Sequence, residues 1–150
     1  MIRTNIDIDP DALALACATA MLGRDRTAQS LGITIEEGRE GSARVAMTVT
    51  ETMINSHDTV HGGITFTLAD TAFAFACNSR NESNVALQAS ISFTKAGRLG
   101  DRFVATAQEL VGGKGRTGLY DVNVTLADGS PIAMFRGVCY RISKPVLIDS

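Results

Sequence analysis

The stretch that decides the fold runs from His61 to Arg80 and reads HGGITFTLADTAFAFACNSR. After its opening glycines it is apolar on every side of a helix, and a helix without a polar face is normally buried. It nevertheless carries one acid, Asp70, near its centre. A carboxylate in apolar surroundings is costly unless it is paired or used. The stretch therefore predicts a buried central helix whose single acid is a candidate functional group.

The segments on either side of this helix are patterned as strands. Upstream, 31–35 and Ser42 to Thr50 alternate between apolar and polar residues, which is typical of half-buried strands. Downstream, short turn-like segments separate four more strand-like runs: Val85 to Thr94, Arg102 to Val111, Thr117 to Leu126 and Ile132 to Ile142. Hairpin-length connections make those late strands antiparallel. Because a twisted sheet can curl around a helix that needs cover on all sides, we predict an α+β fold.

The chain is expected to begin with a helix and to end in a loose tail. Asp9 and Pro10 are typical of a helix cap and a first helical residue, and the alanine-rich segment that follows should be helical until about Gly23. The segment 51–60 is polar and irregular, and 144–150 is expected to be a loose tail. With 150 residues and no repeat or linker, the whole chain is expected to form a single domain.

Composition argues against several classes of protein. The chain is 45% hydrophobic and 20% charged, and its net charge of -2 gives no global attraction to nucleic acid. No apolar run reaches the roughly 18 residues of a membrane span, and acids precede the apolar segment 12–22, unlike a secretory signal. Cys17, Cys77 and Cys139 are widely spaced and odd in number, which suits reduced thiols. We expect a cytoplasmic protein with no nucleic-acid or membrane partner.

The start of the central helix is the first candidate site. Gly62 and Gly63 lie where the first helical amides lack internal acceptors and carry the positive end of the helix dipole. Glycine lets a ligand approach the backbone closely, so main-chain N–H groups here could form an oxyanion hole. The alternative is that both glycines serve only a sharp turn into the helix.

Asp70 is the second candidate. Desolvation would raise its pKa and suit it as a general base or nucleophile, unless Thr67 or Thr71 satisfies it by a hydrogen bond. Asp70 lies eight positions after Gly62, roughly 12 Å along the helix axis and ~80° around it. One small carbonyl cannot contact both groups of one helix. If they act together, they come from two antiparallel helices across a two-fold interface.

Other polar residues flank the helix. In the approach loop, Asn55 could orient a water or a carbonyl, although an Asn in a loop more often serves turn chemistry. His61 could likewise be a structural hydrogen-bonding residue. His57, His61 and Asp58 supply no settled third ligand, so we predict no metal site.

Two basic segments are candidates for binding a polyanion. Lys95 and Arg98 lie in one turn, and Lys114 and Arg116 lie in a glycine-rich turn further on. The alternative is that these charges form an ordinary solvated surface. Gly115 follows the lysine where a P-loop has Ser or Thr. There is also no G-x-S-x-G elbow, which argues against the usual α/β serine hydrolase.

Taken together, these residues resemble a known family. Asn55, His61-Gly62-Gly63 and Leu68-Ala69-Asp70 are similar to the pattern of hotdog-fold acyl-CoA thioesterases, in particular those of phenylacetate degradation. Later segments that look like the same family are Ser92-Phe93, Gly100-Asp101, Thr117 to Asp121 and Phe135 to Gly137. The resemblance covers most of the chain beyond about Leu31.

The resemblance implies a hotdog fold that hydrolyses phenylacetyl-CoA or hydroxyphenylacetyl-CoA type thioesters. It implies that Asp70 is the catalytic carboxylate, that the Gly62 amide of the facing subunit polarises the thioester carbonyl, and that Asn55 and His61 support them. A homodimer with shared sites, and from it a homotetramer, is expected. No cofactor is expected, because CoA is part of the substrate. The residues expected to bind CoA are Gly63, Lys95, Gly97, Arg98, Lys114, Arg116 and Thr117.

Two other functions stay open at this point. One is a hotdog hydratase or dehydratase acting on acyl thioesters, although such enzymes usually pair a catalytic His with an acid differently. The other is a non-catalytic acyl-CoA binding protein. Phe66, Phe73 and Phe75 could line a pocket for an aromatic acyl group, with core packing as the alternative.

Overall fold

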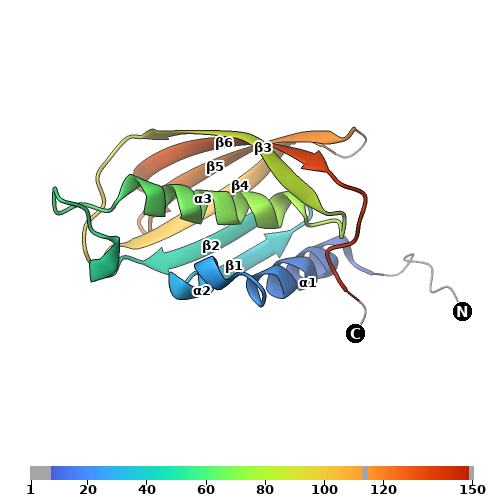
Figure 1. Cartoon of the computed structure of the whole chain (residues 1–150), viewed down its shortest axis with the longest axis horizontal. Coiled ribbons are helices and arrows are strands. Elements are labelled where there is room, and N and C mark those ends of the chain that lie inside the picture. The colour runs from blue at the N-terminus through green and yellow to red at the C-terminus, as the bar shows by residue number, and fades with distance from the viewer. Residues whose placement is uncertain (1–7, 113–114, 149–150) are drawn as a thin grey trace, which may run out of the picture.

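Six strands form one antiparallel sheet that curves around a central helix (Figure 1). The computed structural model describes residues 8–112 and 115–148. The helices are α1 (Pro10–Leu22), α2 (Arg26–Ser30) and the central α3 (Gly62–Cys77), with a single 3-10 turn, η2, at Glu51–Met53. The strands are β1 (Thr34–Arg39), β2 (Ser42–Thr48), β3 (Asn84–Phe93), β4 (Arg102–Val111), β5 (Thr117–Leu126) and β6 (Pro131–Arg141). The predicted α+β architecture is confirmed.

The strand order in the sheet is β1-β2-β4-β5-β6-β3, and every neighbouring pair is antiparallel. The late strands are antiparallel as predicted, but β3 pairs with β6, the last strand, and not with β4. The connection 94–101 therefore leads from one edge of the sheet back to its middle. The pattern of a single strand records which face is buried, but not which strand lies beside it.

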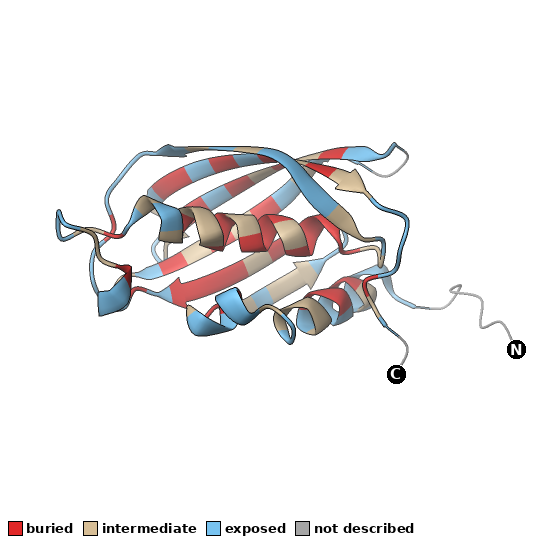
Figure 2. Ribbon diagram, in the orientation of Figure 1, coloured by how far each residue is buried: buried red, intermediate tan, exposed pale blue. Residues whose placement is uncertain are grey.

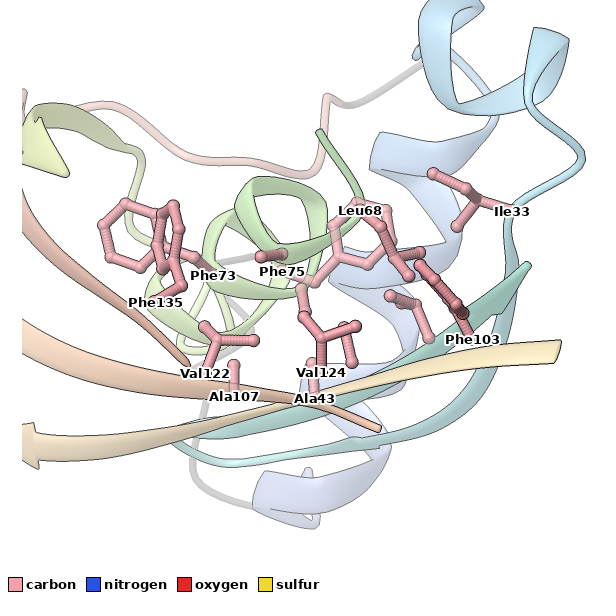
Figure 3. Close-up of a cluster of buried hydrophobic side chains, with 14 of the residues drawn as sticks. Ile33, Ala43, Leu68, Phe73, Phe75, Phe103, Ala107, Val122, Val124 and Phe135 are labelled. Atoms are coloured by element: carbon pink, nitrogen blue, oxygen red, sulfur yellow. The ribbon is translucent and has the colours of Figure 1, made fainter. Parts of the chain in front are cut away.

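The core lies between α3 and the sheet (Figure 3). The labelled side chains that meet there include Leu68, Phe73, Phe75, Phe103, Val122, Val124 and Phe135. The ring of Phe73 packs at centroid distances of 5.7 Å from both Tyr120 and Phe135. A Cβ at Gly137 would come within 2.8 Å of the Phe73 ring, so glycine lets β6 approach the helix. Core packing is thus the role of Phe73 and Phe75 within this chain.

The N-terminal helix is confirmed close to its predicted bounds. The side chain of Asp9 caps α1 by accepting a hydrogen bond of 2.9 Å from the amide of Ala12. The helix ends at Leu22, with Gly23 as its C-cap. Helix α2 was not predicted, because five residues are too few to show a helical period. Strand β1 consequently begins at Thr34, three residues later than predicted.

The predicted loose tail is wrong for 144–147. The side-chain oxygen of Asn81 accepts hydrogen bonds from the amides of Val146 and Leu147, at 3.0 and 2.8 Å. Arg24 donates to the carbonyl of Val146 at 3.0 Å, and the Val146 side chain is buried. These partners are distant in sequence, so the local composition of the tail carries no sign of them. Within the parts of the chain that the structure describes, no helix has the length and apolarity to span a membrane.

Candidate active site

The first residues of α3 present one main-chain donor without an acceptor. His61 is the N-cap, and its Nδ1 accepts a hydrogen bond of 2.9 Å from the amide of Gly63. The carbonyl of His61 accepts from the amide of Ile64 at 2.9 Å. Within 8–112 and 115–148, no acceptor lies on the amide of Gly62. The free N–H at the positive end of the helix dipole is therefore that of Gly62, and not that of Gly63.

A cavity of about 370 Å³ opens beside this amide. It is lined by Thr59, Val60, Gly62, Thr65, Phe93, Thr94, Lys95, Ala96, Gly97 and Ile132. A Cβ at Gly62 would lie 3.1 Å from Cζ of the Phe93 ring, so glycine keeps the space between the helix and that ring open. The cavity brings together three of the predicted site residues, Gly62, Lys95 and Gly97.

Residues 94–97 of the connection 94–101 form part of the wall of this cavity. Gly97 is buried, and a Cβ there would collide with the ring of Phe103. Its carbonyl accepts a hydrogen bond of 2.9 Å from the amide of Val60. Gly97 thus fastens the connection to the approach loop through its backbone. Arg98 is exposed, and its amide donates to the Asp101 carboxylate at 2.9 Å.

Asn55 organises the loop that leads into the helix. Its Oδ1 accepts hydrogen bonds from the amides of His57, at 2.9 Å, and Thr59, at 3.2 Å. Its Nδ2 donates to Oγ1 of Thr59 at 3.1 Å. The loop also holds Asp58 at a φ of 60°, the left-handed region that Asp tolerates better than most residues. Asn55 therefore acts here through turn chemistry, and it sets the position of Thr59 at the edge of the cavity.

Asp70 lies on the least buried stripe of α3, with Gly63, Thr67 and Ala74. The hydroxyl of Thr67 donates to the carbonyl of Gly63 at 2.8 Å, and that of Thr71 donates to the carbonyl of Thr67 at 2.7 Å. Neither threonine satisfies the carboxylate, so that alternative is wrong. Among the residues that the structure describes, no hydrogen-bond donor reaches Asp70. Its side chain is half-buried, not fully buried as the sequence suggested.

The surroundings of Asp70 favour its neutral form. Burial raises the pKa of its carboxyl above the usual range, and the negative charge of Asp25 adds a second, smaller contribution. Asp25 is the N-cap of α2, where its Oδ1 accepts from the amide of Ala28 at 2.9 Å. A carboxylate of raised pKa is a stronger base than an ordinary Asp. The site therefore suits Asp70 to proton abstraction as well as to direct attack.

The residues predicted to bind CoA fall into two groups. Lys95 and Gly97 line the cavity beside the amino end of α3, and Arg98 follows them in the chain, whereas Arg116 and Thr117 line a small cavity with Cys77, the last residue of that helix. The two ends of α3 are fifteen positions apart, about 22 Å at ~1.5 Å per residue. One chain does not bring the two groups together. The remaining basic residue of the turn, at position 114, lies outside the described residues.

Two features of the site were missed from the sequence. The first is Phe93, which borders the cavity. Its position at the end of a strand, next to a basic turn, is the signal that could have identified it. Strand β3 lies at the edge of the sheet and is largely exposed, as its pale blue colour beside α3 in Figure 2 shows. Its exposed apolar side chains are Val85, Leu87 and Phe93. An exposed apolar edge of this kind is a template for pairing with another chain.

A long helix wrapped by a curved antiparallel sheet is the hotdog fold, which confirms the predicted architecture. The chain belongs to the thioesterase superfamily, since the family model of that description matches residues 57–132. That class of enzyme is a hydrolase. The matched span begins in the approach loop and includes the whole of α3, so it contains both Gly62 and Asp70.

Individual relatives agree with this assignment. Over 129 residues the chain is 46% identical to the acyl-coenzyme A thioesterase PaaI of Escherichia coli K12, covering 86% of this chain and 91% of that one. The solved structure of E. coli PaaI aligns with a TM-score of 0.89 at 43% identity, over 91% and 99% of the two chains. A hypothetical thioesterase of Streptococcus pneumoniae, solved with coenzyme A, aligns with a TM-score of 0.71 at 27% identity, over 75% and 90%.

Proposed function

We propose that this thioesterase hydrolyses CoA thioesters of arylacetic acids, such as phenylacetyl-CoA or hydroxyphenylacetyl-CoA, to the free acid and CoA during phenylacetate catabolism. The similarity to a PaaI acyl-CoA thioesterase and to a protein that binds coenzyme A supports this substrate class. The observation that carries the proposal is one helix with a free amide at Gly62 and an unpaired, half-buried carboxylate at Asp70.

The amide of Gly62 acts on the thioester carbonyl. As the carbon is attacked, negative charge develops on the carbonyl oxygen, and a fixed N–H donor at a helix start stabilises it. The free amide borders the cavity, so an acyl thioester that enters there can place its carbonyl oxygen on this donor. His61 and Asn55 position the donor by holding the helix cap and the preceding loop.

Asp70 supplies the second part of the chemistry. It either removes a proton from the attacking water or attacks the thioester carbon itself to form an anhydride that water then opens. Both routes require the ionised carboxylate, and both end in the free acid and the CoA thiol. No cofactor takes part, because water and these protein groups are sufficient.

Each site is shared between two subunits. Within one α3 the two groups lie roughly 12 Å apart along the axis, too far for one small carbonyl. The exposed edge of β3 carries Val85, Leu87 and Phe93, which supports pairing with a second copy of the chain. We propose a homodimer with two antiparallel α3 helices and two equal sites, and a homotetramer built from two such dimers.

The same arrangement unites the two groups of CoA-binding residues. Antiparallel α3 helices place the amino end of one near the carboxyl end of the other, so Arg116 and Thr117 of one subunit approach Lys95 and Arg98 of the other. These cations would meet the phosphates of CoA, with Gly63 beside the pantetheine end and position 114 as a further cation. In this proposal the protein works in the cytoplasm, where acyl-CoA substrates are made.

A panel of acyl-CoA substrates, read by release of free thiol, tests the proposal. We expect the highest kcat/KM for phenylacetyl-CoA and its hydroxylated forms, and lower values for straight-chain acyl groups of similar size. Crotonyl-CoA belongs in the panel because a hydratase would add water to its double bond without releasing thiol. Hydration without thiol release, or CoA binding without turnover of any substrate, would refute the proposal.

A further inference from the structure

Two cysteines that play no part in the proposed hydrolysis meet where α3 ends. Cys77 is the last residue of the helix and Cys139 lies on β6; both are free thiols, 7% and 3% exposed. Both line a cavity of about 30 Å³. Arg80, Arg116 and Arg141 line the same cavity together with Glu82. Arg80 is paired with Glu40 and Glu109, and Arg141 with Glu82.

Close neighbours from the sheet and the helix surround both sulfur atoms. In the sheet, Cys139 lies opposite Gly118, where a Cβ would come within 3.0 Å of the Cys139 sulfur. Glycine at this position therefore makes room for the thiol. The sulfur of Cys77 lies 3.6 Å from the carbonyl oxygen of Ala74 and 3.6 Å from Nδ2 of Asn78.

The two thiols differ in acidity. The neighbouring Cys77 thiol lowers the pKa of Cys139 below that of an ordinary thiol, against the opposing effect of burial, and the backbone at Gly118 lowers it further. The neighbouring Cys139 thiol, together with burial, raises the pKa of Cys77, whose S–H donates to the carbonyl of Ala74 at 3.6 Å. The pair therefore loses its first proton readily and keeps its second. Only a thiolate is a strong nucleophile, so Cys139 is the reactive member.

We propose that Cys139 and Cys77 form a peroxide-reactive dithiol that closes to an intramolecular disulfide. Because both thiols are almost fully buried and the cavity that they line is small, we expect hydrogen peroxide to reach them and a bulky oxidant such as glutathione disulfide to be excluded. This modification site is independent of the proposed thioesterase chemistry.

The reaction balances in two steps. The Cys139 thiolate attacks one peroxide oxygen, the O–O bond breaks, and the departing hydroxide takes up a proton to become water. Cys139 is then a sulfenic acid. The Cys77 sulfur attacks the Cys139 sulfur and gives up its proton, the S–O bond breaks, and the hydroxide leaves as a second water. The two thiols have lost two electrons to one peroxide.

Mass spectrometry of the folded, reduced protein tests the proposal. The protein is treated with hydrogen peroxide, quenched with catalase, denatured, alkylated with iodoacetamide and digested. We expect a disulfide joining the peptides of Cys77 and Cys139. Cys17 is the internal control, because it is also buried and its burial raises its pKa. The pair should oxidise roughly tenfold faster than Cys17. Equal rates at all three thiols, or a disulfide between two chains, would overturn the proposal.

Two variants assign the roles of the two thiols. In Cys77→Ser the resolving thiol is missing, so dimedone should trap Cys139 as its sulfenic acid. In Cys139→Ser the reacting thiolate is missing, so Cys77 should stay alkylatable under the same peroxide treatment. Oxidation of Cys77 at the wild-type rate in Cys139→Ser would contradict the assignment. Glutathione disulfide should leave the wild-type pair reduced, and rapid closure by it would refute the selection by size.

Discussion

Among single residues, Asp70 departs most from what a protein interior normally contains. It is half-buried, burial raises its pKa, and no donor within the described residues reaches it. Nearby threonines could have satisfied it but bond to helix carbonyls. An unpaired carboxylate of this kind opposes folding, and the proposed hydrolysis gives a reason for its presence.

Replacement of the carboxylate by an amide separates stability from activity. Asp70→Asn should lower kcat by roughly 10²- to 10⁴-fold, the usual loss for a general base. A carboxyl whose pKa is raised by folding binds more protons in the folded state, so its ionised form destabilises the fold at neutral pH. Asp70→Asn should therefore have a Tm equal to or above that of the wild type. Thiol-release kinetics and a thermal melt check both expectations; near-normal turnover would remove Asp70 from the mechanism.

Asp25 provides a test of the electrostatic environment. Asp25→Asn keeps a side chain that can cap α2 but removes the charge that helps to raise the pKa of Asp70. In the proposed mechanism activity requires ionised Asp70, so it is lost as the pH falls through that raised pKa. Without the charge the pKa falls, and the acid limb of the kcat/KM profile should move to lower pH. Burial is the larger cause, so we expect a partial shift. An unmoved limb would show that Asp25 has no influence.

At the scale of elements, the predictions succeeded where burial leaves a period in the sequence. Strands β4 and β5 have their predicted bounds, and α3 begins within one residue of its predicted start. The prediction of a loose tail was wrong because the tail is held by hydrogen bonds to Asn81, which is distant in sequence. The pairing of β3 with β6 was not predicted, because pairing depends on the whole sheet.

The candidate site was predictable to the extent that its residues break local rules. Gly62 and Asp70 stood out as glycine at a helix start and acid in an apolar helix, and the structure gives the first a free amide and the second no partner. The place of Phe93 against Gly62 was not predictable, because it arises from strand pairing and loop packing.

A polar cluster fastens the end of α3 to the sheet. The carboxylate of Glu109 on β4 accepts two hydrogen bonds from Arg80, at 2.7 and 3.0 Å, and one from the hydroxyl of Tyr120 on β5, at 2.5 Å. Arg80 lies three residues after the end of α3 and also pairs with Glu40 at 2.9 Å. The cluster therefore joins three elements at the end of the molecule opposite Gly62.

This cluster should contribute to acid sensitivity. The hydrogen bonds from Arg80 lower the pKa of Glu109, with Tyr120 as a further contributor. A carboxyl with a lowered folded pKa stabilises the fold above its ordinary range and loses that contribution as the pH falls below about 4.5. At pH 7, Glu109→Gln should cost about 1.5–3 kcal/mol in urea unfolding, the net value of hydrogen bonds to a charged group. The difference from the wild type should shrink toward pH 3; a constant difference would contradict this origin.

At the scale of the whole molecule, the proposed site requires two chains. The free amide and the carboxylate lie on one helix but are too far apart to act on one carbonyl. The basic residues Lys95 and Arg116 lie at opposite ends of that helix. In the proposed dimer, a second chain pairs with the edge strand β3, whose exposed residues include Val85, Leu87 and Phe93, and completes both sites.

Two variants at Gly62 test the amide donor separately from Asp70. Gly62→Pro removes the N–H, and proline is well tolerated at the first position of a helix. His61 has φ -59° and ψ 131°, a conformation that a residue before proline readily adopts. Gly62→Ala keeps the amide and is the matched control for added bulk beside Phe93. Loss of the donor should lower kcat by roughly 10²- to 10³-fold.

The most direct test of the shared site is the activity of a mixed dimer. Chains with Gly62→Pro and chains with Asp70→Asn carry different affinity tags, are unfolded and refolded together, and the mixed species is isolated by both tags. One of its two sites then has both defects and the other has an intact Gly62 and an intact Asp70. We predict about half of the wild-type activity per dimer, whereas each variant alone is inactive. Inactive mixed dimers, with both tags and the native fold demonstrated, would contradict a site built from two chains.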